Sequence, residues 1–557
     1  MSEKKENAEN AENTAPVNTT PEKTVLERNE VIDRLSVIVK SQGPIDDIID
    51  GVYMGVLAIS LLVCIFFALL GTSVPNIFPV LAPVYDLVYK IPGLIMGMPQ
   101  IVMNFPSKMV YVVTNMSEII VEAKGFLLTF PGILEEFLSQ LEYKKIILTF
   151  SWAAYLWEAY LDVRQRDMLH KINRPKAIKS FVSLQSFLEA NAYGLDKSSL
   201  KIVQSLYEQI KTTIVFQFDI LPWIWQATGK IMESIFGYGP EYEITQSVLF
   251  FVSTSVMSSL TNIPFDLYGT FVIEEKHGFN KQSIGLYFGD FFKTLALTGV
   301  FGSLVLSGLL WVIKMTGTRF YLYVMVFMMA VQFIGITIYP TFIQPLFNKF
   351  TPLEEGELRT AIEELATRVD FPLKKLYVVD GSKRSGHSNA YMYGFFKNKR
   401  IVLFDTLIKQ TNLEEVCAIL AHELGHWKMS HVVKMLIFGQ LQLFVIFYLF
   451  SLVVAQRKMY SDFNFTTSQP ILIGFTLYQY LYQPVDSLVT FIFNKLSRKH
   501  EFEADAYSKS LGYAKPLRDG LIKLHLENKG NVNPDPLYSA YHYSHPPLVE
   551  RLNAIEQ

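Results

Sequence analysis

The chain has 557 residues, of which 50% are apolar, and its formal net charge is −2 at pH 7. A mean hydropathy of +0.23 is too high for an ordinary soluble enzyme. The near-zero net charge argues against a strongly charged partner, and we expect no nucleic acid to bind. The two cysteines, Cys64 and Cys417, do not suggest a disulfide framework, which is compatible with a site that faces the cytosol.

The first part of the chain combines a polar tail with an apolar region that is rich in proline. Residues 1–45 are rich in Glu, Asn, Thr and Lys, a composition typical of a disordered tail. No basic segment with an early apolar core is found, so we expect no cleaved signal peptide. The run from Val52 to Leu70 has the length of one transmembrane helix. Prolines forbid one continuous helix over the rest of residues 46–143, which we expect to be membrane-associated.

Seven further apolar runs approach the ~20 residues that a helix needs to cross a bilayer. They lie near residues 146–162, 213–236, 246–268, 291–313, 320–345, 433–455 and 470–492. The run at 213–236 is the weakest, because Asp219 and Pro222 interrupt it. Ionisable residues within these runs, such as Glu158 and Asp219, would face the bundle interior or water rather than lipid. For these two residues, a role in packing and a functional role both remain open.

A soluble insert at residues 346–430 separates the fifth of these runs from the sixth. Its first segment, Thr351-Pro-Leu-Glu354, combines a capping box with proline at the first helical position, and predicts a helix that runs to about Thr367. Two short strands are predicted, with a polar loop between them that enters a further strand. These segments are Lys375–Asp380, Arg400–Phe404 and the loop Gly381–Gly394.

The motif that points most directly to chemistry is His422-Glu423-Leu424-Gly425-His426. The preceding pairs Thr411/Glu414 and Asn412/Glu415 form two overlapping capping boxes, which indicate that the motif lies on a helix. Residues four apart share a helix face, so the two histidines can form half of a zinc site, with the glutamate as general base for the attacking water. Alone, the motif could also consist of two ordinary histidines.

A second cluster, Glu501-Phe-Glu-Ala-Asp505, lies further along the chain. Glu501 can complete a site of two histidines and one glutamate, the usual ligand set of catalytic zinc. Asp505, four residues later on the same helix face, can hold a ligand imidazole by its distal N–H. Glu503 points away from this face, and we expect it to contribute nothing to the metal site. Alone, the cluster could be a solvated helix face, but the two clusters together favour zinc.

The two clusters and four other motifs occur in one order along the chain. In this set of motifs the chain resembles the type I CAAX prenyl endopeptidases, membrane zinc metalloproteases that process prenylated proteins and the a-factor precursor. The other motifs are Val272–Lys281, Phe347–Leu353, Gly381–Gly394 and Tyr541–Pro547. The likeness covers roughly residues 144–557. It implies an all-α membrane barrel of about seven spans, preceded here by one extra N-terminal span, with a small α+β zinc-metalloprotease domain inserted.

The resemblance also implies a role for individual residues. It implies one zinc ion per chain, held by His422, His426 and Glu501, with Glu423 as the catalytic base. Two further residues, Asn389 and Arg551, would hold the substrate backbone, and His545 would lie at the attacked carbonyl. Four other histidines are interpreted as ordinary side chains: His387, His431, His500 and His542.

The predicted organisation has six parts. They are a disordered tail, an extra membrane-associated region, a first set of transmembrane helices, a soluble protease insert, a second set of transmembrane helices, and a C-terminal protease part with the third zinc ligand. The boundaries are 1–45, 46–143, 144–345, 346–430, 431–495 and 496–557.

Basic residues indicate the orientation of the chain in the membrane. The predicted loop 163–212 holds nine Lys and Arg residues, whereas the loop 237–245 on the opposite side holds none. Because loops rich in Lys and Arg stay in the cytosol, we expect a multi-pass protein whose active site is accessible from the cytosol. The resemblance places it in the endoplasmic reticulum and the inner nuclear membrane.

The function implied by the resemblance is removal of the C-terminal aaX tripeptide from prenylated CAAX proteins, with a second, N-terminal cleavage of some substrates. Its partners would be prenylated proteins or lipopeptides and membrane lipid. Two alternatives remain open: a membrane quality-control zinc endopeptidase, and a non-catalytic membrane scaffold or transporter with a structural zinc. Glu423 argues against the scaffold, because a structural zinc site needs no general base.

Overall fold

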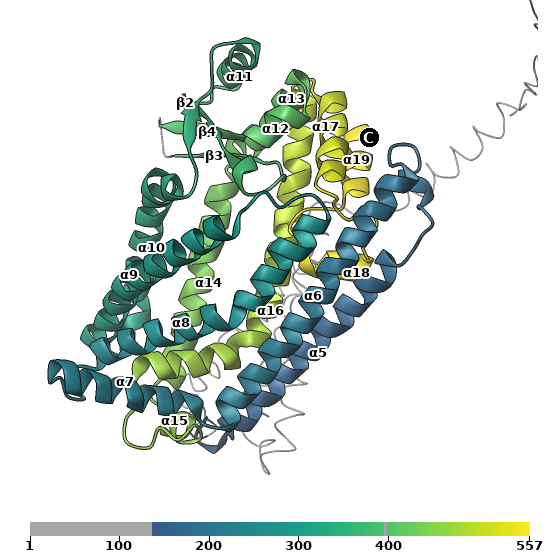
Figure 1. Ribbon diagram of the computed structural model, residues 1–557. Helices are drawn as coiled ribbons and strands as arrows, with labels where there is room; N and C mark the ends of the chain where they lie inside the picture. Colours follow the sequence, from purple (N-terminus) through teal and green to yellow (C-terminus); the bar gives the residue numbers. More distant parts are fainter. Residues whose placement is uncertain (1–135, 137, 395–397) are drawn as a thin grey trace, which may run out of the picture. The chain divides into compact units, whose positions relative to one another are not determined.

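The computed structural model describes residues 136, 138–394 and 398–557 (Figure 1). The chain divides into two units between residues 133 and 134, and the description below concerns only the second. The predicted tail at 1–45, the predicted span Val52–Leu70 and nearly all of the region 46–143 lie outside the described residues.

Long helices make up most of the described chain (Figure 1). They are α5 (Tyr143–Leu169), α6 (Leu184–Gln217), α7 (Ile220–Phe236), α8 (Glu243–Tyr268), α9 (Ile284–Thr316), α10 (Phe320–Ile338), α14 (His431–Val453) and α16 (Ile471–Ser510). Helix α5 packs against α6 and α16, and the series continues through α7, α8, α9, α10 and α14, each packed on the next. Many large apolar side chains on these helices are exposed, such as Leu304 and Val432, which are 65% and 63% exposed.

Three runs of the described chain are long and apolar enough to cross a membrane. They are 243–274, 284–346, which contains both α9 and α10, and 431–453. Exposing apolar helices of this length to water is unfavourable in free energy, whereas lipid accommodates them. The chain is therefore an integral-membrane protein. The number of spans stays a prediction, although each of the seven predicted runs coincides with a helix or with two successive helices.

The run at 213–236 is interrupted where the sequence suggested. Helix α6 ends at Gln217 and α7 begins at Ile220, with Asp219 between them in a left-handed conformation at φ 52°. The Asp219 carboxylate accepts a hydrogen bond of 2.8 Å from Lys144, so this acidic residue joins helices α5 and α7. The prediction of a loop at 163–212 was wrong over most of its length, because α6 occupies it and buries Phe187 and Tyr193.

A four-stranded sheet follows α10. Its strands are β1 (Phe350–Pro352), β2 (Leu373–Val379), β3 (Ala390–Tyr393) and β4 (Lys399–Phe404), in the order β1-β2-β4-β3. Strands β2 and β4 are parallel, and the other two pairs are antiparallel. The strands predicted near β2, β3 and β4 are confirmed, and β3 forms an edge of the sheet.

The helix predicted to begin at Thr351 starts later. Residues Phe350–Pro352 form strand β1, which pairs with β2, and helix α11 spans Glu357–Arg368. The capping pattern was a local signal only, and pairing with the neighbouring strand overrode it. The predicted end of this helix, near Thr367, is confirmed.

The remaining helices are α12 (Asp405–Gln410), α13 (Leu413–Lys428), α17 (Ala514–Glu527), α18 (Pro536–His542) and α19 (Leu548–Glu556), while the short α15 (Arg457–Ser461) lies near α7. Of these helices, α12 and α13 contact the sheet, and α17, α18 and α19 pack against α16 (Figure 1). Apolar residues of α11, α13 and the sheet form one buried core, which includes Ile362, Ile401, Leu403 and Leu420. This core holds α13 against α16.

Candidate metallopeptidase site

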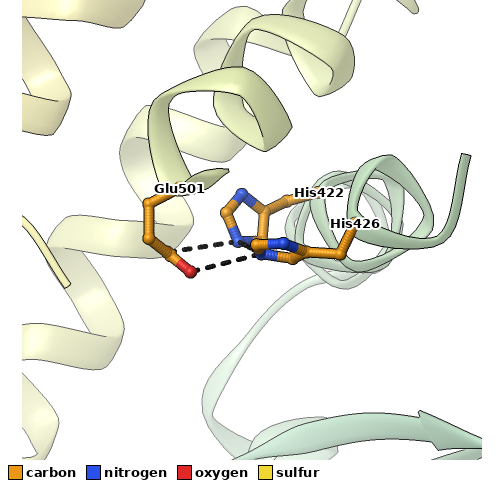
Figure 2. Close-up of side chains that lie close together, drawn as sticks. All are labelled: His422, His426 and Glu501. Carbon is orange, nitrogen blue, oxygen red and sulfur yellow. Dashed lines mark hydrogen bonds and ion pairs between the residues drawn. The ribbon is translucent and has the colours of Figure 1, made fainter. Parts of the chain in front are cut away.

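Helix α13 presents the two histidines of the sequence motif. Asn412 caps it by accepting a 2.9 Å hydrogen bond from the Glu415 backbone N–H, and the Glu415 carboxylate accepts one from the Asn412 N–H. Of the two predicted capping boxes, this one is confirmed. His422 is buried and His426 half-buried, and both project from the helix face that contacts α16 (Figure 2).

Glu501 reaches the two imidazoles from α16 (Figure 2). Its carboxylate oxygens lie 3.5 Å from Nε2 of His422 and 3.2 Å from Nε2 of His426. The two Nε2 atoms are themselves 3.2 Å apart. The sequence placed these side chains about eighty residues apart, and the contact between α13 and α16 brings them together.

The three groups fit a metal ion. Tetrahedral zinc with bonds of ~2.0–2.1 Å keeps its ligand atoms about 3.3 Å apart, close to the three separations above. The Oε2 atom of Glu501 is buried without a hydrogen-bond partner. Two imidazole lone pairs and a carboxylate that face one another in this way repel unless a cation lies between them.

A buried ion pair supports the cluster from behind. Asp505 accepts a 2.8 Å hydrogen bond from Nδ1 of His422, which leaves the Nε2 lone pair of that ring directed toward Glu501. The Arg551 guanidinium binds Asp505 through two hydrogen bonds of 2.8 and 2.6 Å. This hydrogen bond is compatible with the role that the sequence predicted for Asp505, and Arg551 holds the Asp505 carboxylate.

The site shifts the pKa values of its groups. Burial disfavours a charged imidazole, but hydrogen bonds to Asp505 and Glu501 outweigh it and raise the pKa of His422 to about 9. Burial opposes ionisation of Glu501 too, yet hydrogen bonds from His422 and His426 hold its pKa well below the usual range. Burial raises the pKa of Glu423, with a smaller contribution from Glu501. In the protein without a metal ion, a proton on these histidines thus supplies part of the positive charge that the metal would provide.

A cavity of about 220 Å³ opens onto the cluster. Glu423, Asn389 and His545 line it together with the three ligand candidates and Arg551. Asn389 immediately precedes the edge strand β3, and Nε2 of His545 lies 3.4 Å from Oε1 of Glu501. A second cavity of about 530 Å³ shares Asn389, His545 and Arg551 with the first. The candidate residues from the sequence all line the first cavity except Asp505, which contacts His422 and Arg551.

Two of these residues differ in how freely they can meet a ligand. The His545 side chain is 66% exposed, so its imidazole can approach a bound molecule. The Arg551 side chain is 11% exposed and is paired with Asp505. Its predicted contact with a substrate backbone would have to coexist with that pair.

A further polar group lies behind His426, where sequence reasoning expected none. Nδ1 of His426 is 2.9 Å from Nδ1 of His431, and Nε2 of His431 is 2.8 Å from Oε2 of Glu503. The ring of His500 stacks on that of His431 at a centroid distance of 4.0 Å. Glu503 is not among the three groups that converge at the candidate metal site, but His431 connects it to His426 through two short contacts.

Two family models match most of the chain. A model described as CAAX prenyl protease N-terminal, five membrane helices, matches residues 165–349, and the model of peptidase family M48 matches residues 352–557. The chain belongs to peptidase family M48. It is an integral-membrane metallopeptidase, and the resemblance seen in its motifs is confirmed.

Full-length relatives and a solved structure support the same assignment. The CAAX prenyl protease 1 homolog of Oryza sativa is 45% identical over 75% of this chain and 98% of its own length. The human homolog is 42% identical over 74% of this chain and 94% of its own. A crystal structure of S. mikatae Ste24p, with 41% identity and a TM-score of 0.71, covers 74% of this chain and 99% of that one.

Proposed function

We propose that this metallopeptidase uses zinc to remove the C-terminal tripeptide from prenylated CAAX proteins at the cytosolic face of the endoplasmic reticulum and inner nuclear membrane. The observation that carries the proposal is the 220 Å³ cavity, in which His422, His426 and Glu501 converge beside Glu423. The names of the similar proteins, CAAX prenyl protease 1 and its homologs, supply the substrate class.

The proposed ligands are His422, His426 and Glu501, which offer the two nitrogens and one oxygen typical of catalytic zinc. Bound there, zinc would supply Lewis-acid chemistry that polarises the scissile carbonyl. Asp505 supports this ligand set through its hydrogen bond to Nδ1 of His422, and Arg551 supports it through two hydrogen bonds to Asp505.

Glu423 is the proposed general base. It is half-buried in the same cavity, and its raised pKa suits a carboxylate that must take up a proton and hold it briefly. It accepts a proton from the attacking water as the new carbon–oxygen bond forms. When the carbon–nitrogen bond breaks, it donates that proton to the leaving amine.

Substrate would bind along the edge of the sheet. Strand β3 pairs with β4 on one side only, so its other edge can accept an extended peptide through main-chain hydrogen bonds. Asn389, at the start of β3, would hold the substrate backbone. The imidazole of His545 would donate a hydrogen bond to the carbonyl oxygen as negative charge develops on it. We assign Arg551, which lines the same cavity as Asn389, to this backbone subsite.

The membrane helices suit a lipid-modified substrate. Helix α14 begins at His431, five residues after His426, and α16 continues from the span predicted at 470–492 to Glu501. The proposed zinc site therefore borders the membrane-spanning part of the chain, where a prenyl group can remain among apolar side chains. Burial of such a chain contributes ~25 cal/mol per Å² of apolar area.

A matched pair of peptides tests the proposal. We expect the farnesylated CAAX peptide to be cleaved with a higher kcat/KM than its unprenylated twin in the same liposomes, and the product to be the free tripeptide. Glu423→Gln serves as the inactive control. Equal or better cleavage of the unprenylated peptide would favour the quality-control endopeptidase, and no cleavage of either peptide by metal-loaded protein would favour the scaffold.

A further inference from the structure

The polar group behind His426 is built by a sharp turn between two helices. Helix α13 ends at Lys428, and Ser430 adopts a left-handed conformation at φ 57° before α14 begins at His431. A non-glycine residue rarely adopts this conformation unless its surroundings require it. The turn returns His431, which is only 3% exposed, to the side of His426.

The hydrogen bonds of this group have one consistent direction. The ionised carboxylate of Glu503 can only accept, so Nε2–H of His431 donates to it over 2.8 Å. Nδ1 of a neutral His431 is then an acceptor, and Nδ1–H of His426 donates to it over 2.9 Å. His426 is thereby left with its lone pair on Nε2, the atom 3.2 Å from Glu501.

We infer that His431 and Glu503 form a positioning relay, which holds His426 in the tautomer and ring orientation that metal binding requires. The inference rests on the proposed metal site and adds two residues to it. The arrangement on the other ligand is parallel, since Asp505 accepts from Nδ1 of His422 directly. Each histidine of the site is thus tied to a carboxylate of α16, one directly and one through a second imidazole.

A second metal ion is the rival explanation, because the possible ligand atoms of His431, His500 and Glu503 all lie within 4.8 Å of one another. Two observations favour the relay. Both ring nitrogens of His431 already have hydrogen-bond partners. The rings of His431 and His500 also stack with an interplanar angle of 9°, whereas two ligands of one tetrahedral ion must converge on it.

Metal affinity tests the relay without reference to catalysis. Purified full-length protein would be titrated with Zn²⁺ against a competing chelator, and with Co²⁺ to record the visible absorption that reports the ligand geometry. His431→Leu and Glu503→Ala should each weaken Zn²⁺ binding by about 10–100-fold, the usual effect of losing a partner of a ligand imidazole. The Co²⁺ spectrum should change as well.

Two matched variants separate positioning from general packing. The side-chain oxygen of asparagine can take the place of Nδ1, so His431→Asn should recover most of the affinity that His431→Leu loses. His500→Phe keeps the stacked ring without its nitrogens and should bind Zn²⁺ as the unaltered protein does. Thermal unfolding of each variant in detergent would show that it remains folded.

The results distinguish failure of the relay from failure of the proposed function. Unchanged Zn²⁺ affinity and Co²⁺ spectrum in folded His431→Leu, or no recovery in His431→Asn, would overturn the relay alone. Two ions per chain, with one lost in His500→Phe, would also overturn it in favour of a second metal site. If the unaltered protein bound no Zn²⁺, or if Glu501→Ala bound it equally well, the proposed function itself would fail.

Discussion

Charge determines what the site can hold at the scale of single residues. With Glu423 ionised, three carboxylates line the space around His422, and the guanidinium of Arg551 is the cation that faces them. The two remaining negative charges suit a divalent cation. Asp505 and Glu501 are almost fully buried, so their negative charge must be neutralised. If the cation were lost, protons bound to the histidines would have to neutralise it.

Glu423→Gln tests the proposed base. The carboxamide keeps the shape of the side chain but cannot accept the proton, so we expect the peptidase rate to fall by about 10²–10⁴-fold. Metal content should remain as in the unaltered protein, because Glu423 is not one of the proposed ligands. Elemental analysis beside a peptide-cleavage assay would check both, and near-normal turnover would remove Glu423 from the mechanism.

Cys417 provides a prediction about pH. It is 3% exposed, and burial raises the pKa of its thiol to about 11. Since the thiolate is the reactive form, and forms only as the pH rises toward that value, native Cys417 should resist alkylation at pH 8. The test is iodoacetamide labelling of a Cys64→Ser variant before and after denaturation. Rapid labelling of the folded variant at pH 8 would contradict the prediction.

At the scale of elements, local sequence signals were reliable where tertiary contacts agreed with them. The capping box of Asn412 and Glu415 begins α13 as predicted, and Lys523 binds the same glutamate at 2.8 Å. The Thr351 capping pattern failed because pairing with β2 uses that segment. The role of His431 was missed because no helical period joins residues five apart across a left-handed turn. The spacing of a third histidine just after the motif was the available signal.

Asn412→Ala tests whether this cap matters to the site. Loss of a side-chain cap typically costs about 1 kcal/mol, and the first turn of α13 should fray. In the folded variant, the backbone amide hydrogens of residues 411–420 should exchange with solvent faster than in the unaltered protein. Glu414→Ala is the control, because Glu414 is exposed and belongs to the alternative capping box. Equal acceleration in both variants would show that the cap of Asn412 is not what holds the helix start.

At the scale of the whole molecule, helix α16 joins the predicted span at 470–492 to the candidate site. Its 40 residues, with Pro484 inside the helix, extend from the predicted span to the carboxylates at Glu501, Glu503 and Asp505. The same helix thus carries a proposed ligand and both supporting carboxylates. The sequence predicted the family and the candidate site residues because the motifs and their order are specific, but it divided this helix between a span at 470–492 and a separate part that begins at residue 496. It could not predict the course of α6, because a charged helix packed on neighbours lacks the apolar run that marks a span.

The tail supplies the last prediction. Similar proteins are covered almost end to end by about three quarters of this chain, and the family models together begin at residue 165. Residues 1–45 are polar and nearly free of aromatic residues, so they can contribute little to a packed core. We therefore expect protein that lacks residues 1–45 to keep its metal content and to cleave the farnesylated peptide with kcat/KM unchanged.

The control for this deletion is Glu423→Gln in the shortened chain, which must be inactive if the cleavage is due to the proposed site. Both proteins would be reconstituted at equal density in the same liposomes, so that access to the lipid-bound peptide is the same. A large fall in kcat/KM in shortened protein that is folded and metal-loaded would mean that the tail takes part in catalysis or in substrate capture. If kcat/KM falls because KM rises while kcat is unchanged, the tail takes part in substrate capture rather than in catalysis.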